Sequence, residues 1–291
     1  ATGTPPGDNI DLATTPVAGA AADWTPALPA ELSGLSPIEG SDIVVLRYLS
    51  PEQAPLPALT LAASSIVESR AASGTVATEG SGLFALADCS GATVFQASAA
   101  PSATQMTVQV AGLNQSDLGF VSGHDGTITY KPGGSTLYRA ESVAYYVALN
   151  PQTNVPSLYR ARWSTTPGSN ALTRTTEELV EGIESMQLLY GEDANSENLA
   201  VAPSGHITKT NTAATISDPA QSLALQAGRW RRVGAVQLGL VVRGGGGEGS
   251  AAEEAGVRPQ VLEVRMDAPA DGHYRTAYET TVALRNRLFG N

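Results

Sequence analysis

The consecutive stretches SVAYYVALN (Ser142–Asn150) and SLYRARW (Ser157–Trp163) decide the fold class. Apolar residues occupy every second position of the first stretch and would share one face: Val143, Tyr145, Val147 and Leu149. This period of two is typical of a β-strand. Asn150-Pro151 predicts a turn, so the second stretch is expected to return as the partner strand of a hairpin, with aromatic residues on both strands.

Strand patterns also occur before and after this hairpin. Short or alternating apolar segments predict strands at 82–88, 92–97, 106–110, 186–190, 236–242, 262–266 and 278–284. Residues 43–48 form a continuous run rich in β-branched and aliphatic side chains, which predicts a strand buried on both faces.

Helical signals are few. Residues 175–184 begin with two threonines that can cap a helix, followed by Glu177 and Glu178 in the first turn, where the helix dipole favours acidic groups. A second short helix is expected at 219–228. About ten strands and at most two or three short helices predict an α+β fold that is mainly antiparallel β.

The chain is expected to have two parts. Residues 1–40 are rich in Ala, Pro, Gly and Thr and predict an irregular arm, with Trp24 as its anchor. Residues 41–291 are expected to form one β-rich domain with loop insertions near 192–218 and 244–256.

Composition excludes several classes of function. The 291 residues carry a net charge of -11, which disfavours binding to nucleic acid and to anionic lipid surfaces. Cys89 is the single cysteine, so the chain has neither an internal disulfide nor a thiolate zinc site. His124, His206 and His273 lack the spacing of a metal motif. No apolar run approaches the roughly 20 residues that span a bilayer.

Candidate chemical sites have weak support. Gly244, Gly246 and Gly249 match a dinucleotide-binding pattern, with Asp267 downstream, but four consecutive glycines produce this match trivially and favour a hairpin loop. The set Glu177, Glu181 and Glu184 would lie on one face of the first helix, and a solvated face is favoured over acid–base catalysis.

Two further clusters leave alternatives open. Asp193, Asn195 and Glu197 have the alternate spacing of a calcium loop but too few ligands, which favours an ordinary turn. The run Arg229–Arg232 favours the start of a strand with Trp230 in the core over a platform for single-stranded nucleic acid. Trp230 and Arg231 remain candidates for a protein interface. Cys89 is either a buried thiol or the partner of a cysteine in an upstream segment. We assign no catalytic, cofactor-binding or metal-ligating residue.

Six stretches, in this order along the chain, resemble the PilW family of type IV pilus minor pilins. They are Gly40–Ser50, Ala87–Ser98, Ser142–Asn150 with Ser157–Trp163, Glu178–Asp193, Trp230–Arg243 and Tyr274–Leu288. The sequence GEDANSEN (residues 191–198) departs from the more Asp- and Gly-rich loop of many relatives, which puts any family metal site in doubt.

The resemblance implies a pilin-like periplasmic domain with an enlarged sheet region. Members carry a leader cut by prepilin peptidase and then a hydrophobic helix that anchors them in the inner membrane, so this chain is expected to be a fragment that lacks the helix. Members often carry a cysteine after that helix, and Cys89 would be its disulfide partner in an oxidising periplasm.

The resemblance also implies a role in assembly without catalysis. Such subunits join other minor pilins in a complex that primes the pilus and stays at its tip, where it contacts the major pilin and holds a PilY1-type adhesin. Two alternatives remain, namely a tip subunit of a type II secretion system similar to pseudopilin J, and a free-standing β-rich adhesin or glycan-binding module. An enzyme is the least favoured alternative.

Overall fold

The computed structural model describes most of the chain and divides it into two compact units. It describes residues 9–12, 28, 30–56, 58–62, 65–69, 82–89, 91–100, 106–114, 130–131, 133–244, 258–269 and 271–284. One unit comprises Ala1–Val44, Tyr145–Arg160 and Glu177–Asn291, and the other comprises Val45–Ala144 and Ala161–Thr176. The boundary expected at residue 40 stays a prediction, and Trp24 and His124 lie outside the described residues.

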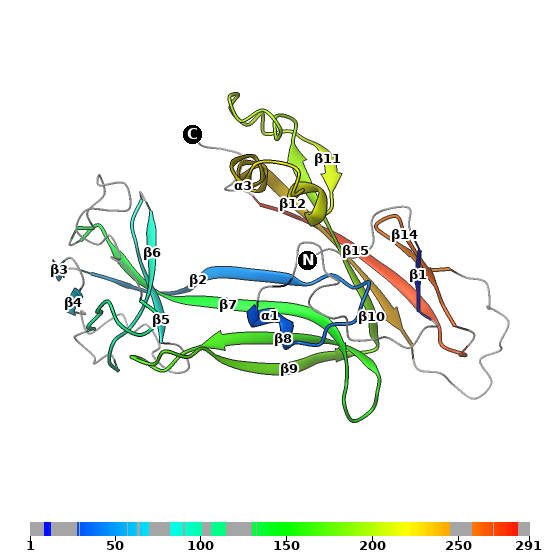
Figure 1. Cartoon of the computed structure of the whole chain (residues 1–291), viewed down its shortest axis with the longest axis horizontal. Helices are drawn as coiled ribbons and strands as arrows, with labels where there is room; N and C mark the ends of the chain where they lie inside the picture. The colour runs from blue at the N-terminus through cyan, green and yellow to red at the C-terminus, as the bar shows by residue number, and fades with distance from the viewer. Residues whose placement is uncertain are drawn as a thin grey trace. The chain divides into compact units, whose positions relative to one another are not determined.

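The described residues form mostly antiparallel sheets with three short helices, which confirms the predicted fold class (Figure 1). The largest sheet has the order β6-β5-β7-β8-β9, and β2 also pairs with β7. Its strands are β2 (Val44–Pro55), β5 (Leu83–Ala87), β6 (Ala92–Gln96), β7 (Thr136–Leu149), β8 (Pro156–Ser164) and β9 (Thr173–Glu181).

The second sheet has four strands in the order β11-β10-β12-β15: β10 (Ile183–Asp193), β11 (Ile207–Asn211), β12 (Val233–Arg243) and β15 (Arg275–Ala283). Two smaller sheets complete the described strands: β1 (Asn9–Asp11), β13 (Gln260–Val261) and β14 (Val264–Asp267) form one, and β3 (Ala58–Ala62) and β4 (Ser65–Ser69) form the other. The helices are α1 (Ala30–Ser33), α2 (Ala213–Ile216) and α3 (Leu223–Arg231).

The predicted hairpin is present as β7 and β8. Asn150 closes its turn, because its amide donates to the Val155 carbonyl and its side-chain oxygen accepts from the amides of Gln152 and Thr153. The sequence predicts one apolar face on β7, but both of its faces are partly buried. Tyr146 and Val147, which are adjacent and point to opposite faces, are both buried. Tyr146 stacks on Tyr159 of β8, with ring centroids 5.7 Å apart, as expected for aromatic cross-strand pairs.

Residues 43–48 are expected from the sequence to form a strand buried on both faces, and the expected burial is wrong. This segment begins β2, but Leu46 and Tyr48 are 45% and 44% exposed. A strand buried on both faces requires cover on both sides, and composition alone does not show whether the cover exists.

The predicted helix at 175–184 is wrong. Its first residues belong to β9, all nine residues of which are exposed. Gly182 then takes the left-handed region with φ 84° and links the strands, since its amide donates to Pro156 and its carbonyl accepts from Arg243. Helix propensity and a cap are a weak prior that tertiary pairing overrides.

Other boundaries shift for local reasons. The expected strand at 106–110, with Met106, Val108 and Val110 predicted on its buried face, is only a single bridge at Thr107. Met106 and Val108 are buried, but Val110 is 45% exposed. The helix expected at 219–228 is α3, which begins later because Ser222 caps it by accepting from the Leu225 amide. The turn-rich segment 192–218 includes β11 and α2, and of the expected loop 244–256 only Gly244 is described.

Apolar residues cover both faces of the four-stranded sheet. On one face Ile183 and Met186 pack with Val147 and Ile38. On the opposite face Leu189 and Val241 pack with a cluster from the β13–β14 hairpin: Val261, Leu262, Val264 and Met266. Strand β10 is therefore an interior strand of the fold.

The β13–β14 hairpin interrupts the strand expected at 262–266. Its two-residue turn consists of Leu262 and Glu263, with φ 47° and 66°, which is the left-handed backbone that hairpin turns of this length require. The turn fits closely on the sheet because Gly239 has no side chain. A Cβ there would lie 2.2 Å from Val261 Cγ2 and 3.0 Å from Leu262 Cγ.

We predict that Gly239→Ala destabilises the protein by about 1–3 kcal/mol, the usual cost of overpacking a tight core contact. Gly91→Ala is the control, because a Cβ at Gly91 meets nothing within 4 Å. Urea unfolding followed by circular dichroism measures both variants. An equal stability of Gly239→Ala and the parent would show that the hairpin does not depend on this close approach.

Candidate functional site

The basic run Arg229–Arg232 does not form a basic surface. Its residues lie at the end of α3 and just beyond it, and not at a strand start, because β12 begins at Val233. Arg229 and Arg232 are buried, whereas Arg231 is exposed. A platform for nucleic acid therefore has one exposed cation from this run, which is far fewer than phosphate recognition uses.

Arg229 forms a buried ion pair with Glu192 of β10. Its Nε and Nη2 donate to the two carboxylate oxygens at 2.9 Å and 2.6 Å, and Asn211 Nδ2 also donates to Glu192 at 2.6 Å. Burial alone would raise the pKa of Glu192, but these hydrogen bonds outweigh it and lower the pKa. The carboxylate is thus held as an anion by its partners, which suits a structural role and not proton transfer.

Arg232 organises the loop that follows β10. Its guanidinium donates to the carbonyls of Asn195, Asn198, Leu199 and Val201. Five N–H donors in one plane allow a single side chain to satisfy several loop carbonyls. Arg232 therefore supplies a fixed positive charge at the centre of this loop.

The three residues of the calcium-like pattern do not converge on a ligand position. Asp193 is fully buried and accepts from the amides of Asn195, Ser204 and Gly205 and from the Ser204 hydroxyl, and these donors lower its pKa against the effect of burial. The side-chain Nδ2 of Asn195 donates to the Ala202 carbonyl, and Glu197 forms an ion pair with Lys209. These hydrogen bonds hold the segment as a turn, and the choice between an ordinary turn and a calcium loop stays a prediction.

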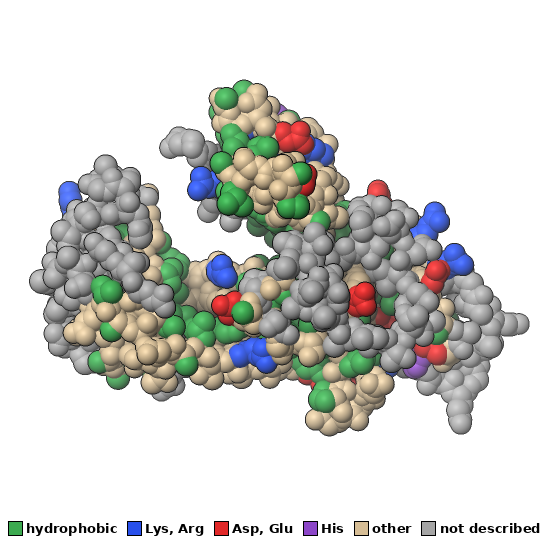
Figure 2. Space-filling model, in the orientation of Figure 1, with side chains coloured by type: hydrophobic (Ala, Val, Ile, Leu, Met, Phe, Trp, Pro, Cys, Tyr) green, Lys and Arg blue, Asp and Glu red, His purple; other side chains and the backbone are tan. Residues whose placement is uncertain are grey.

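Trp230 is half-buried and Arg231 is exposed. The Trp230 indole packs edge-on against Tyr190 at 4.9 Å and donates to Ser217 Oγ at 2.9 Å. Exposed apolar residues lie in the same part of the unit, namely Leu199, Val201 and Leu223. Figure 2 shows hydrophobic side chains gathered on the surface over the region of α3.

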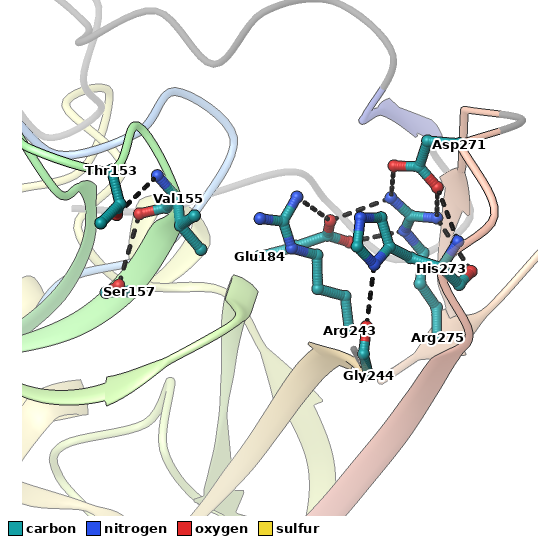
Figure 3. Close-up of polar contacts among 9 residues, drawn as sticks. All are labelled: Thr153, Val155, Ser157, Glu184, Arg243, Gly244, Asp271, His273 and Arg275. Carbon is teal, nitrogen blue, oxygen red and sulfur yellow. Dashed lines mark hydrogen bonds and ion pairs between the residues drawn. The ribbon is translucent and has the colours of Figure 1, made fainter. Parts of the chain in front are cut away.

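The three glutamates expected on one helical face are separated. Glu177 pairs with Arg160, Glu181 is exposed, and Glu184 is buried in β10. Glu184 accepts from Arg275 Nε at 2.7 Å and Nη2 at 3.0 Å (Figure 3). The idea that they form one acid–base set is therefore wrong, because the segment is not a helix.

Arg275 is the centre of a polar cluster that the sequence did not indicate (Figure 3). Besides Glu184, it donates to both oxygens of Asp271, at 2.8 Å and 2.7 Å, and these bonds lower the pKa of Asp271 to about 2. Arg243 lies 3.8 Å from Glu184, and His273 Nδ1 lies 2.9 Å from the Gly244 carbonyl. The cluster joins β10 and β15 through charge-assisted hydrogen bonds, and Arg243 of β12 adds a longer ion pair to Glu184.

The remaining predicted residues are isolated. His206 is exposed, and within the described ranges no three His, Cys, Asp or Glu side chains gather as a metal site would require. Cys89 is a free, exposed thiol in the turn between β5 and β6, so it is not buried. Its pairing with an upstream cysteine stays a prediction. Gly246 and Gly249 lie outside the described residues.

One open groove of about 720 Å³ runs beside β15. Residues of five strands and of the β13–β14 turn line it, among them Leu189, Gln237, Leu262, Glu263, Glu279 and Thr281. The lining is mostly polar, and its two carboxylates make it acidic.

The chain described so far is a mainly antiparallel β protein in which internal ion pairs and hydrogen bonds hold buried charged side chains such as Glu192, Arg229 and Arg232. Residues 144–286, about half of the chain, match the family model PilW, described as type IV pilus-assembly protein W, and the match supports assignment to the PilW family. No curated protein and no solved structure matches the chain.

The family is one of pilus-assembly proteins and is not a known enzyme family. It implies involvement in type IV pilus assembly, and it suggests contacts with other assembly components and a periplasmic or pilus-associated location. Among the helices described, none has the length and apolar character that crossing a membrane requires.

We predict that Arg229→Met destabilises the protein by about 3–5 kcal/mol, because it leaves the Glu192 carboxylate buried without its cation. Arg231→Met, at an exposed position of the same helix, should change stability by no more than about 0.5 kcal/mol. If Arg229→Met does not fold, the double variant Arg229→Met/Glu192→Met should restore folding, since it removes both charges. A stable single variant would contradict the importance of this pair.

The Asp271–Arg275 pair should make stability depend on acid pH. The pKa of Asp271 in the folded protein, about 2, lies below the ordinary value of 3.8. The pair therefore stabilises the folded state fully above about pH 4 and loses this effect as the pH falls towards 2. We expect Asp271→Asn to cost about 1 kcal/mol at pH 7, after allowance for partial exposure.

Unfolding free energies of the parent and Asp271→Asn between pH 7 and pH 2 measure this effect. The difference in unfolding free energy between the parent and Asp271→Asn should be constant above about pH 4 and become smaller below it. Glu181→Gln, which removes an exposed carboxylate, is the control for the change in net charge. A difference that stays constant down to pH 2 would contradict the expected effect.

Proposed function

We propose that this chain is a minor pilin subunit that helps to prime type IV pilus assembly. In this role it joins other minor pilins in a complex that stays at the pilus tip, where it contacts the major pilin and a PilY1-type adhesin. In this proposal a hydrophobic helix encoded upstream of these residues would hold the subunit at the periplasmic face of the inner membrane before assembly.

The observation that carries the proposal is the PilW match over residues 144–286. The matched region includes the whole four-stranded sheet and helix α3. Its buried charged groups are engaged in internal ion pairs, such as Glu192 with Arg229 and Glu184 with Arg275, or in hydrogen bonds to loop main chain, as Arg232 is. Exposed apolar side chains are therefore the groups of this region that are most available for contact with a partner.

We propose the α3 surface as one contact with another subunit. We define it by Leu199, Val201, Leu223, Trp230 and Arg231. Leu223, the first residue of α3, is 81% exposed, and Arg231, its last residue, adds an exposed cation at the other end of the helix. An exposed apolar patch with tryptophan and arginine at its side is typical of protein interfaces.

Deletion of the gene in the organism that encodes it tests the role. We predict that deletion strongly reduces the number of surface pili counted by electron microscopy, and that the full-length gene restores them. Normal piliation without the gene would overturn the proposal. Normal piliation together with loss of type II secretion would instead identify the pseudopilin alternative.

The contact has its own matched pair of variants. Arg231→Glu in the full-length protein should lower co-purification with the other minor pilins at least fivefold, because it reverses the charge of the α3 surface. Arg174→Glu makes the same charge change on exposed β9 and should not lower it. Equal losses in both variants would place the contact elsewhere.

A further inference from the structure

Five described strands lie at open ends of the two larger sheets: β2, β6, β9, β11 and β15. An end strand presents backbone N–H and C=O groups that can pair with another chain. Strands β6 and β11 are short, with five residues each, whereas β9 and β15 have nine residues each.

The long end strands differ in the features that prevent pairing. Strand β9 carries four charged residues among its nine, namely Arg174, Glu177, Glu178 and Glu181. Strand β2 contains Pro51 and Pro55, which lack an N–H, and the charged Arg47. Charges and prolines on an edge are the usual means of blocking strand addition.

Strand β15 lacks this protection. Its first residue, Arg275, is buried in the pairs with Glu184 and Asp271, so that its charge is not available at the edge. From Thr276 to Ala283 the only charged residue is Glu279. The last six residues of the strand are all exposed, although Tyr and Val are among them.

The two faces of β15 offer different side chains to an added strand. Tyr278 and Val282 are 60% and 53% exposed, and they lie opposite Leu240 and Val236 of β12 on one face. On this face an incoming strand would find apolar and aromatic partners. Cross-strand pairs of this kind contribute to sheet stability.

The other face borders the acidic groove. Glu279 lies opposite Gly239 and accepts from the Leu262 amide at 2.7 Å, so its carboxylate is held beside the β13–β14 turn. Glu263, the second residue of that turn, also lines the groove. Two carboxylates therefore stand near the middle of the strand, where they favour a cationic neighbour.

We propose that the edge of β15 that no described strand covers accepts an extended segment of another polypeptide, which adds to the four-stranded sheet as a fifth strand. The segment has β-branched or aliphatic residues next to Tyr278 and Val282, and a lysine or arginine next to Glu279. The inference rests on the proposed function for the source of the segment, which is another subunit of the pilus complex.

A second copy of this chain is a poor donor. Glu279 is the middle residue of Arg275–Ala283, so two β15 strands paired antiparallel about their centres would place Glu279 opposite Glu279. Like charges directly opposite destabilise a strand pair. The net charge of -11 adds repulsion between copies.

A synthetic peptide tests the edge directly. The probe is Thr-Val-Thr-Val-Lys-Val-Thr-Val-Thr, and a second peptide with Glu in place of Lys is its control. Binding to the 291-residue chain is measured by fluorescence anisotropy, and amide hydrogen exchange locates the bound strand. We expect the Lys peptide to bind at least tenfold more tightly than the Glu peptide. We also expect it to slow hydrogen exchange of the backbone amides within 276–283.

Substitutions then separate this edge from the others. Val282→Lys should weaken binding at least tenfold, and Glu263→Lys should reduce the preference for the Lys peptide. Val180→Lys makes the same change on β9, where Val180 is 48% exposed, and should leave binding unchanged.

Three results would overturn the proposal: no binding of the Lys peptide, equal losses in Val282→Lys and Val180→Lys, or a dimer in sedimentation that Val282→Lys disrupts. The last result would assign the edge to a second copy. A failure of the peptide experiment would leave the piliation result unaffected, so the two proposals fail separately.

Discussion

Burial of β10 is the constraint on which the rest of its unit depends. Its residues pair with β12 along almost the whole strand, while β11 takes the other edge only near residues 190–193. Where β11 does not reach, Ser41 and Asp42 replace a strand, with hydrogen bonds to the main chain at Met186 and Leu188. Because apolar clusters contact both faces of β10, a defect here would disturb both cores at once.

The charged residues of this unit follow from the same burial. Glu184 and Glu192 lie on β10 itself, and each would be costly in the interior without a cation. Arg275 from β15 and Arg229 from α3 supply these cations with two hydrogen bonds each. The chain is acidic overall, yet four of its basic groups, including Arg232 and Arg243, serve the interior or its border.

This distribution connects structure with function. Groups suited to catalysis need freedom to exchange protons or to touch a substrate, whereas the buried carboxylates are fixed by multiple donors. The surface instead offers exposed apolar residues around α3 and a sheet edge at β15 with little charge. Such surfaces suit association with other proteins. This agrees with a family whose members take part in pilus assembly.

The sequence by itself determined the β-rich class, the β7–β8 hairpin and the strands 236–242 and 278–284, because a period of two and turn residues such as Asn150 act locally. Only the tertiary structure decided that residues 175–181 form β9 and not a helix. It also decided that Glu184 pairs with Arg275, 91 positions away, and that Glu192 pairs with Arg229. The physical reason is that burial and ion pairing depend on residues far along the chain, and no local pattern records which strands will meet.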